Sequence, residues 1–494
     1  MAENDEFQVR REKLKNLREK NIEPYPYSYD YTKTISQIIS EYGDKDETEL
    51  EKTEYKEKTP GRIIAKRIMG GASFFHLSNG KDKLQIYVKK NIIGSDEYKL
   101  FKSFDMGDII GVEGRVFRTK TGELTIVVEK FKFLSKSLLP LPEKWHGLQD
   151  KELRFRQRYL DLIINRESRE VFEKRFLMIR QIRKFLDDRG YIEVETPMMQ
   201  SIPGGALAKP FITHHNALNI DLYLRIAPEL YLKRLLVGGF ERVYEINRNF
   251  RNEGISSHHN PEFTMLEFYQ TYSDYKDLIK LTEELFKTLI DEGLTEEVIE
   301  YNGKKINLAP PFKKLDILEA IAEHSPLSIE ELNDKETVIK HALKLAGEDN
   351  LSPVYSKALD YIFDEYVTEH LVDPTFIINH PIEISPLSKP HREMEGRTER
   401  FELFIAGMEL ANGFSELNDP AIQLERFSEQ VKDREAGDDE AHMIDYDYIR
   451  ALEYGMPPAA GEGIGIDRLA MIITGTNSIK EVILFPLLKP KKQD

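Results

Sequence analysis

The feature that most constrains the fold is a run of short, strand-like segments between residues 61 and 138. Apolar and polar side chains alternate within four of these segments, residues 62–67, 83–88, 109–117 and 124–133. This period is typical of half-buried β-strands, and turn residues such as Ser78-Asn79-Gly80 separate the segments. So many short strands in so short a stretch predict a small closed barrel.

The composition of this stretch favours the oligonucleotide-binding (OB) fold among small barrels. Residues 60–137 contain 15 Lys+Arg and 8 Asp+Glu, a local charge of +7 in a chain whose net charge is −16. Phe74, Phe75 and His76 offer stacking surfaces among these basic residues, although neighbours on a strand face opposite ways, so at least one of the two phenylalanines belongs to the core. We therefore expect nucleic acid at the barrel.

The chain divides around Pro140-Leu141-Pro142, a stiff sequence that marks the end of the barrel. The predicted parts are an N-terminal helical extension (1–55), the barrel (56–139), a linker (140–152) and a large domain (153–494) with a helical insertion at about 289–373. In the extension we expect a helix over residues 8–21. Most of its charges are those of a solvated surface helix, but its basic residues could also contact a nucleic-acid backbone: Arg10, Arg11, Lys13, Lys15 and Arg18.

Several classes of protein are excluded by what the sequence lacks. It contains no cysteine, which rules out disulfides, thiolate zinc sites and a cysteine nucleophile. No stretch approaches the roughly 18 consecutive apolar residues of a membrane span. The acidic beginning, Met1 to Asp5, is unlike a secretory signal or a transit peptide. We expect a cytoplasmic protein that does not interact with membranes.

Three segments of the large domain carry charged or glycine-rich patterns. In the first, a helix over residues 172–189 leads through Gly190 into an extended segment that ends at Pro197. The second contains Arg251-Asn252-Glu253; on a strand this spacing would place both charges on one face, where the arginine could meet a phosphate. The third, residues 461–469, has glycines that allow close backbone approach and a helix that begins near Arg468.

Each segment also has a simpler interpretation when it is considered alone. The first could be ordinary packing, and the second could be a surface ion pair. The third could be a glycine-rich strand end, although a charged Arg468 beside an apolar strand calls for an anionic partner.

Taken in order, the three segments resemble motifs 1, 2 and 3 of class II aminoacyl-tRNA synthetases, and the barrel in front of them resembles subclass b. Four further strings are typical of bacterial-type lysyl-tRNA synthetases: residues 154–161, 213–218, 225–233 and 412–419. The likeness extends from about Phe7 to Pro490. It implies an α+β fold, in which an OB-fold barrel precedes a catalytic domain built on an antiparallel sheet flanked by helices.

The resemblance also implies the reaction. In this family the carboxylate of lysine attacks the α-phosphate of ATP, pyrophosphate leaves, and the lysyl group then passes to the 3′ end of tRNA(Lys). No protein nucleophile takes part, so the residues of interest position substrates and stabilise charge. The catalytic residues it implies are Arg251 and Arg468. The ATP-binding residues are Arg251, Glu253, His259, Phe263 and Arg468.

The amino-acid pocket implied by the resemblance is acidic. Glu416 would pair with the ε-ammonium of lysine, helped by the Tyr269 hydroxyl, while Glu229 and the backbone of Gly205 would hold the α-amino group. A cation in a closed pocket needs such a partner, because leaving it unpaired costs about 3–5 kcal/mol. The full set of lysine-binding residues is Gly205, Glu229, Arg251, Glu267, Tyr269, Asn412, Phe414 and Glu416.

The remaining implied sites concern metal, tRNA and a second subunit. Glu402 and Glu409 match the Mg²⁺ ligands of the family; their spacing of seven puts them on one face of a helix but not of a strand, and alone they could be a solvated acidic face. The expected anticodon-binding residues of the barrel are Arg67, Phe74, Gln85 and Glu123. Motif 1 forms a dimer interface in this class, so we expect a homodimer. The sequence departs from common family residues at Gly71, Lys209, His258 and Met408.

Three other functions share some of these sequence features. A relative that lysylates a protein usually lacks the barrel. A catalytically silent, regulatory or nucleic-acid-binding relative predicts changes at the catalytic and metal positions, yet Arg251, Glu253, Glu402, Glu409 and Arg468 are all present. A nucleic-acid-binding barrel fused to an unrelated domain is a third possibility.

Overall fold

The computed structural model describes residues 2–53, 55–142, 148–206, 208–347, 351–435 and 443–490. Its contacts divide the chain into two compact units, Met1–Glu170 and Val171–Asp494. The predicted linker, 140–152, falls partly outside the described residues, at 143–147, and the predicted domain limits remain predictions. In the described part of the chain, no helix combines the length and the apolar character that crossing a bilayer would require.

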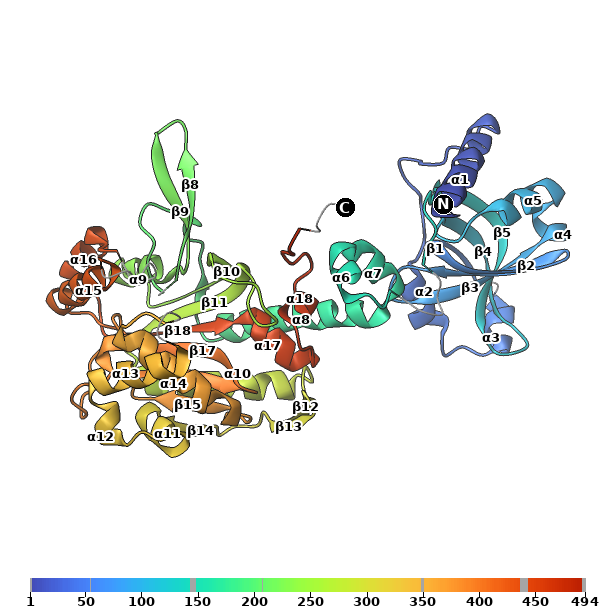
Figure 1. Ribbon diagram of the computed structural model, residues 1–494. Helices are drawn as coiled ribbons and strands as arrows, with labels where there is room; N and C mark the ends of the chain where they lie inside the picture. The colour runs from blue at the N-terminus through green and yellow to red at the C-terminus, as the bar shows by residue number, and fades with distance from the viewer. Residues whose placement is uncertain are drawn as a thin grey trace. The chain divides into compact units, whose positions relative to one another are not determined.

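The first unit contains the predicted barrel (Figure 1). Its five strands close in the order β1-β2-β3-β5-β4. Their bounds are β1 Lys56–Met69, β2 Ala72–Ser78, β3 Lys83–Lys89, β4 Ile109–Arg118 and β5 Leu124–Ser135. Alternation along β2 buries Phe75 and Leu77 in the barrel core and leaves Phe74 and His76 partly exposed. The prediction that one of the two adjacent phenylalanines is core is therefore confirmed.

The first unit also contains helices, and several of them add to the barrel core. They are α1 Ala2–Glu19, α2 Ile35–Tyr42, α3 Glu47–Thr53, α4 Lys90–Ile93, α5 Ser95–Ser103, α6 Lys151–Arg156 and α7 Arg158–Ile164. Leu17 of α1 and Ile38 of α2 belong to the same apolar cluster as the strands. Arg10 is not a solvated charge, because it is buried and donates to the carbonyls of Met106, Ser137 and Leu139.

The second unit is built on a sheet of eight strands, in the order β14-β15-β16-β17-β18-β11-β10-β6. The central strands are antiparallel, and the end pairs β14–β15 and β10–β6 are parallel. The bounds are β6 Ile192–Glu193, β10 Arg242–Phe250, β11 Glu262–Thr271, β14 Lys313–Asp316, β15 Thr375–Ile378, β16 Arg400–Ile405, β17 Met408–Ser415 and β18 Ala459–Gly465. The predicted α+β class is confirmed.

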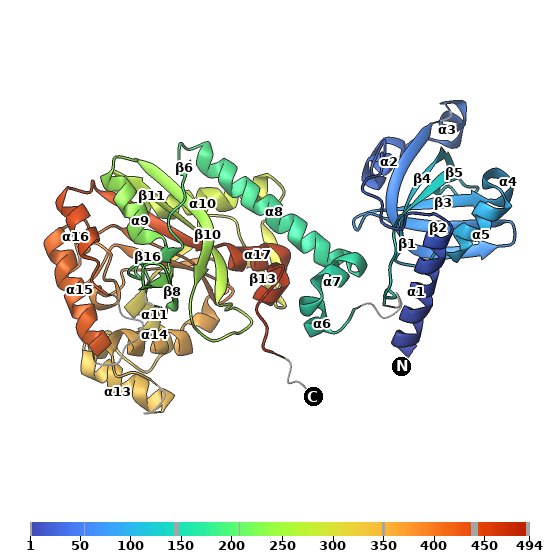
Figure 2. The ribbon, with the colours of Figure 1, turned by 90° about the horizontal axis from the view of Figure 1, so that it is seen from above.

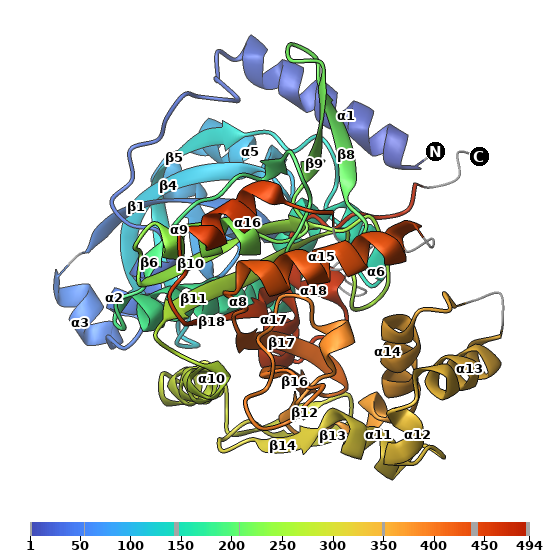
Figure 3. The same cartoon turned by 90° about the vertical axis from the view of Figure 1, so that its left-hand side faces the viewer.

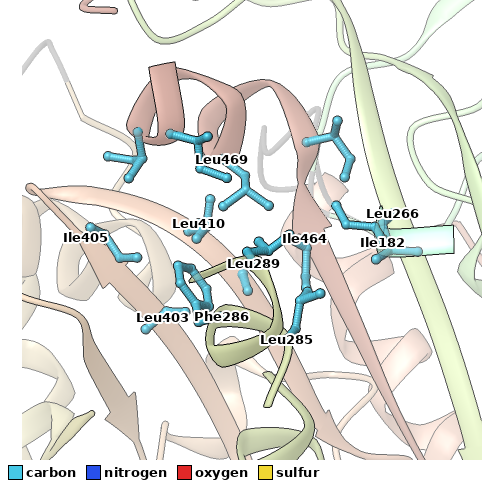
Figure 4. Packing of buried hydrophobic residues seen from close by; sticks show 14 of the residues in the cluster. Ile182, Leu266, Leu285, Phe286, Leu289, Leu403, Ile405, Leu410, Ile464 and Leu469 are labelled. Atoms are coloured by element: carbon cyan, nitrogen blue, oxygen red, sulfur yellow. The ribbon is translucent and has the colours of Figure 1, made fainter. Parts of the chain in front are cut away.

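Three helices cover one face of this sheet: α8 (Arg166–Asp187), α10 (Tyr275–Asp291) and α17 (Ile466–Thr474). Figure 2 shows α8 leading to the short edge strand β6. In Figure 4, Phe286 and Leu289 of α10 pack near Leu403, Leu410 and Ile464 of the sheet. The opposite face of the sheet is left for the functional side chains.

The predicted helical insertion at about 289–373 is only partly helical. Residues 298–316 form the hairpin β12 (Val298–Tyr301) and β13 (Lys304–Asn307), and then β14, an edge strand of the main sheet. The Lys/Glu-rich composition was misleading because exposed edge strands also carry charged residues. The helical part, which includes η1 (Thr368–His370), shares one apolar cluster, and Figure 3 shows its helices grouped together: α11 Ile317–His324, α12 Ile329–Leu332, α13 Lys335–Ala346 and α14 Tyr355–Tyr366.

The remaining elements of the second unit lie in its connections. A small sheet contains β7 (Met199–Gln200), β8 (Phe211–His215) and β9 (Ile220–Leu224). The other helices are α9 Glu229–Val237, η2 Ile382–Ile384, α15 Pro420–Glu435, α16 Tyr446–Glu453 and α18 Ile479–Val482. Among these, α9 carries two charged side chains that lie at the candidate site.

Candidate active site

A cavity of about 570 Å³ lies against the sheet face opposite the core helices. With the exception of Glu416, every residue predicted for the catalytic-domain sites lines it. These residues are Gly205, Glu229, Arg251, Glu253, His259, Phe263, Glu267, Tyr269, Glu402, Glu409, Asn412, Phe414 and Arg468. The structure thus brings together residues that are widely separated in the sequence.

Strand alternation explains how one face of the sheet collects these side chains. On β11, Phe263, Glu267 and Tyr269 line the cavity, whereas Leu266 and Phe268 between them enter the core. Successive side chains of a strand point to opposite faces. The alternation therefore separates a polar, substrate-sized cavity from the apolar core across a single layer of backbone.

Arg251 and Glu253 lie in a loop, contrary to the prediction that a shared strand places them on one face. Strand β10 ends at Phe250, and only the Arg251 N–H continues the ladder, donating to the Pro261 carbonyl at 2.9 Å. Because Pro261 has no N–H to return, the pairing stops there. Both side chains still line the cavity.

Arg251 has an unsatisfied donor at the cavity wall. Its guanidinium carbon lies 5.1 Å from the centroid of the Phe263 ring, and its buried Nε has no hydrogen-bond partner among the described residues. A buried donor without an acceptor costs roughly 1–3 kcal/mol. This arrangement suits an anionic ligand that supplies the missing acceptor.

Arg468 comes from the first turn of α17, where the chain leaves β18. Its Nη1 donates to the main-chain carbonyl of Glu409, and its Nη2 lies 3.1 Å from His259 Nε2. Burial and the Arg468 charge lower the pKa of His259. The imidazole is therefore kept neutral and can accept a hydrogen bond from Arg468.

Asp467 positions the arginine that follows it. Its Oδ2 accepts the Thr264 N–H of β11 at 2.7 Å, and its Oδ1 lies 2.6 Å from Arg175 Nη1 of α8. Asp467 is almost completely buried. These contacts fix the start of α17 against both the sheet and the helix layer, so the direction of Arg468 is set by the core.

The other end of the cavity is acidic. Glu267 accepts a hydrogen bond from the Tyr269 hydroxyl at 3.2 Å, and burial together with the Glu229 charge raises the pKa of Glu267 to about 8. Gly205 has φ +89°, and a Cβ there would lie 2.8 Å from the Glu229 Cβ. A side chain at residue 205 would therefore be strained and would crowd the pocket.

Glu416 is the one predicted pocket residue that does not line the cavity. It is 1% exposed, and its Oε2 contacts Lys233 Nζ. Its Oε1 has no hydrogen-bond partner among the described residues and lies 2.5 Å from the position of a Cβ built on Gly461, a glycine that does line the cavity. The carboxylate thus lies just outside the cavity, close to the Tyr269 ring, where the absence of a side chain at Gly461 leaves room for both groups.

Glu402 and Glu409 lie on neighbouring strands, an arrangement that sequence spacing did not predict. In the β16–β17 register, Glu402 pairs with Asn412 and Glu409 pairs with Phe404. The hairpin, and not a helix, brings both carboxylates to the cavity. In the same wall, Asp360 and Asp364 of α14 add two acidic side chains that the sequence analysis missed.

Glu402 is held in its charged form by its neighbours. Arg400 Nη2 lies 2.5 Å from Oε1, and His380 Nε2 lies 3.5 Å from Oε2. Burial opposes ionisation, but Arg400 and His380 outweigh it and lower the pKa of Glu402 to about 2. No cluster of three or more potential metal ligands occurs among the described residues. Two carboxylates beside a cavity nevertheless fit Mg²⁺, which commonly combines one or two carboxylates with substrate phosphates.

The predicted anticodon-binding residues of the barrel form a connected surface cluster. Phe74 stacks on Tyr87 with ring centroids 4.4 Å apart, and Arg67 faces Phe74 across the β1–β2 pair. Gln85 Nε2 donates to Glu123 Oε2 at 2.7 Å. The cluster therefore combines a stacking platform with amide and carboxylate groups, as the reading of unpaired bases requires.

Comparison with known proteins agrees with both halves of this geometry. Residues 150–489 match the family described as tRNA synthetases class II (D, K and N), and residues 59–134 match an OB-fold nucleic acid binding domain. Three similar proteins are named lysine–tRNA ligase. That of Pelotomaculum thermopropionicum is 56% identical over 99% of this chain and 96% of its own length. Those of Carboxydothermus hydrogenoformans and Bacillus cereus are 53% and 51% identical, over 99% of this chain and 99% and 98% of their own lengths.

The chain belongs to the class II lysyl-tRNA synthetases. In this synthetase, sequence reasoning missed Lys233, His380 and Arg400, which contact predicted site residues. Lys233 did have a local signal, because it follows Glu229 by four positions on one helix. That spacing usually marks a surface ion pair, so nothing in the sequence distinguished this buried pair from an ordinary one.

Proposed function

We propose that this synthetase activates L-lysine with ATP, forming lysyl-adenylate and pyrophosphate, and then transfers the lysyl group to the 3′ end of tRNA(Lys). The observation that carries the proposal is the polarity of the cavity. Arg251 and Arg468 lie at one end, and Glu229 and Glu267 lie at the other, with Glu416 just outside the cavity. A substrate that fits such a cavity is cationic at one end and reacts with a polyphosphate at the other.

The arginine end supports adenylate formation. The unsatisfied Arg251 Nε supports a role for that guanidinium in bridging the lysine carboxylate and the α-phosphate, so that the carboxylate oxygen is aligned to displace pyrophosphate. Phe263 and Glu253 would hold the adenine ring and its amino group. Arg468, with His259 beside it, would bind the terminal phosphates.

The acidic end supports selection of lysine. Glu229 and Gly205 would hold the α-ammonium, and Glu416, with Tyr269 and Glu267, would accept the ε-ammonium. Asn412 and Phe414 line the space between the two ends. Amino acids that lack the second ammonium would leave buried carboxylates without a partner, a cost that favours lysine strongly.

Glu402 and Glu409 would hold Mg²⁺. When bound, such an ion would supply positive charge against the negative charge that develops on the leaving pyrophosphate. Arg400 and His380 support this role because they keep Glu402 ionised and fix its direction. Glu402 is thus ready to coordinate a hard cation at neutral pH.

The barrel would read the anticodon of tRNA(Lys). Phe74, stacked on Tyr87, offers its ring to an unpaired base, and Gln85 and Glu123 offer polar groups to base edges. Arg67 lies beside Phe74 and would contact phosphate. We place this enzyme in the cytoplasm, where its proposed substrates occur.

We also propose a homodimer. Motif 1 and the residues just after it leave large apolar side chains exposed, including Phe176, Ile192 and Met199, each at least half exposed. Contiguous exposed apolar residues commonly mark protein interfaces. Sedimentation equilibrium measures the assembly directly, and a monomer at micromolar concentration would contradict the proposal.

The experiment that tests the function is exchange of labelled pyrophosphate into ATP with each of the twenty amino acids. Lysine alone should support rapid exchange, because activation is reversible and needs only the cavity. Exchange with none of them would favour a catalytically silent relative, and exchange with a different amino acid would overturn the pocket assignment. Charging of tRNA(Lys) in the same preparation tests the second step.

A further inference from the structure

Behind the acidic end of the cavity, Lys233 forms a buried ion-pair cluster that the proposed reaction does not yet use. Its Nζ lies 2.6 Å from Glu229 Oε1 and also contacts Glu416 Oε2. The Lys233 side chain is completely buried, and its ammonium lies 5.1 Å from the centroid of the Phe414 ring. Lys233 therefore touches three residues that have been assigned to lysine binding.

Several buried charged groups surround Lys233. Glu229, Glu267 and Glu416 are three buried carboxylates, and Lys233 is the cation that contacts two of them. Two nearby arginines are engaged elsewhere: Arg225 pairs with Glu245 at 2.7 Å, and Arg400 pairs with Glu402. Among the described residues, the pocket thus carries an excess of two negative charges when all three carboxylates are ionised.

A substrate lysine supplies two ammonium groups, and its carboxylate has been assigned to Arg251. In the empty pocket Glu267 holds a proton near neutral pH, because its pKa is about 8. Binding of two ammonium groups favours ionisation of all three carboxylates, and the excess of two negative charges then matches the substrate. Without Lys233 the excess would be three, and a buried charge without a partner is strongly unfavourable. One carboxylate would then take up a proton or turn away, and it would no longer serve the substrate.

We propose that Lys233 is a specificity-determining positioning residue: a built-in counter-ion that orients Glu229 and Glu416, offsets part of the cost of burying their charges, and sets the pocket's charge for an amino acid with two ammonium groups. The inference rests on the proposed function. Lys233 itself does not line the cavity, so it acts through the two glutamates. Burial opposes its charge, but the flanking carboxylates outweigh burial and raise the pKa of Lys233.

The first test is Lys233→Met, which keeps much of the side-chain volume and removes the charge. In pyrophosphate exchange, the KM for lysine should rise about tenfold or more, the cost expected for a broken buried pair, while the KM for ATP stays within about twofold. A purely structural role predicts less folded enzyme, which lowers the apparent kcat and leaves both KM values unchanged.

Lys136→Met is the matched control. Lys136 is also a buried lysine between two carboxylates, at 2.7 Å from both Asp105 and Asp108, but it lies in the barrel unit. Its substitution should affect stability and leave the KM for lysine unchanged. Equal KM increases in both variants would contradict the proposal.

The second test separates charge from shape and uses the absence of cysteine in the chain. In Lys233→Cys, the single thiol is alkylated in denaturant and the protein is refolded. Aminoethylation restores an ammonium at nearly the reach of lysine, whereas propylation gives a neutral side chain of similar length. The aminoethylated form should recover a KM for lysine within about threefold of wild type, and the propylated form should not.

The outcomes distinguish this inference from the proposed function. If the wild-type enzyme shows no lysine-dependent exchange, the proposed function fails. If the wild type is active but Lys233→Met keeps a normal KM for lysine, or the two alkylated forms behave alike, the counter-ion role is wrong. Wild-type enzyme that has been denatured, treated with the alkylating reagent and refolded is the control for refolding. If this control does not regain activity, the result for Lys233→Met decides the question.

Discussion

The barrel and the catalytic cavity bind their proposed ligands in opposite ways. In the barrel, Phe74 and Glu123 are at least partly exposed, and the groups assigned to the anticodon already have partners: Phe74 stacks on Tyr87, and the buried Gln85 donates to Glu123. In the cavity, Arg251 and Glu416 keep polar atoms unsatisfied in buried positions. An exposed cluster loses little when one member is removed, whereas a buried charged site loses its balance. Substitutions in the cavity should therefore have larger effects.

The largest effect is expected at Arg251. Arg251→Ala removes the group assigned to the α-phosphate, and loss of one such donor commonly lowers kcat by about a hundredfold to a thousandfold. Pyrophosphate exchange measures the change. The control is Arg248→Ala. Arg248 lies on β10, three residues before Arg251, pairs with Glu262 at 3.6 Å and does not line the cavity, so this variant should retain exchange. Comparable losses of pyrophosphate exchange in both variants would contradict the role assigned to Arg251.

Glu416→Gln should have the next largest effect. The amide keeps the shape but loses the charge that faces the ε-ammonium and Lys233, and a broken buried pair of about 3 kcal/mol corresponds to about a hundredfold increase in the KM for lysine. The KM for ATP should change little. The exposed Glu425→Gln is the control. An unchanged KM for lysine in Glu416→Gln would contradict the assignment of Glu416 to the lysine pocket.

Phe74→Ala tests the proposed role of the barrel in binding the anticodon. Loss of one stacked base costs about 1–3 kcal/mol, so kcat/KM for tRNA(Lys) charging should fall about tenfold or somewhat more. Pyrophosphate exchange should remain normal, because the barrel takes no part in activation. Tyr27→Ala removes a fully exposed aromatic of the same unit and should affect neither assay. Equal losses in charging and exchange would show that the barrel does not act as a separate reader.

The smallest effect on activity is expected at Glu462, a buried carboxyl on the core face of β18. Its oxygens lie 2.7 Å from the Thr282 hydroxyl, and burial raises its pKa to about 8. The folded protein therefore holds a proton that the unfolded chain releases near pH 4.5, so this group makes stability fall as pH rises from about 4.5 to about 8.

Glu462→Gln should remove that fall, which amounts to roughly 3–4 kcal/mol between pH 5 and pH 8 for a pKa raised from 4.5 to about 8. Urea unfolding followed by circular dichroism at pH 5 and pH 8 measures the difference between variant and wild type. The exposed Glu300→Gln should behave like wild type. If the stability of Glu462→Gln depends on pH as that of the wild type does, Glu462 is not protonated in the folded protein. The kinetic constants of the variant should remain normal in either case.

Sequence reasoning succeeded where local pattern and residue type are sufficient. Alternation identified four of the five barrel strands and the adjacent aromatics of the fifth, and motif order identified catalytic-domain residues of which all but Glu416 line the cavity. It failed where a partner is distant in the chain. Residues 313–316 form a strand because β14 pairs with the distant β15, and a Lys/Glu-rich segment does not reveal that pairing. Arg251 lies beyond the end of β10 because Pro261, the residue just before β11, accepts one backbone hydrogen bond but has no N–H to donate in return.

The sequence by itself determined which chemical groups are present: arginines for phosphate, glutamates for cations, and aromatic and amide groups on a barrel. Only the tertiary structure decided which charges meet. Helix α9 joins Glu229 to Lys233 by local spacing, but the approach of Glu416 requires the whole sheet to fold. Ion pairing in a buried site depends on distance and desolvation, and both are set by packing between segments that the linear sequence does not place together.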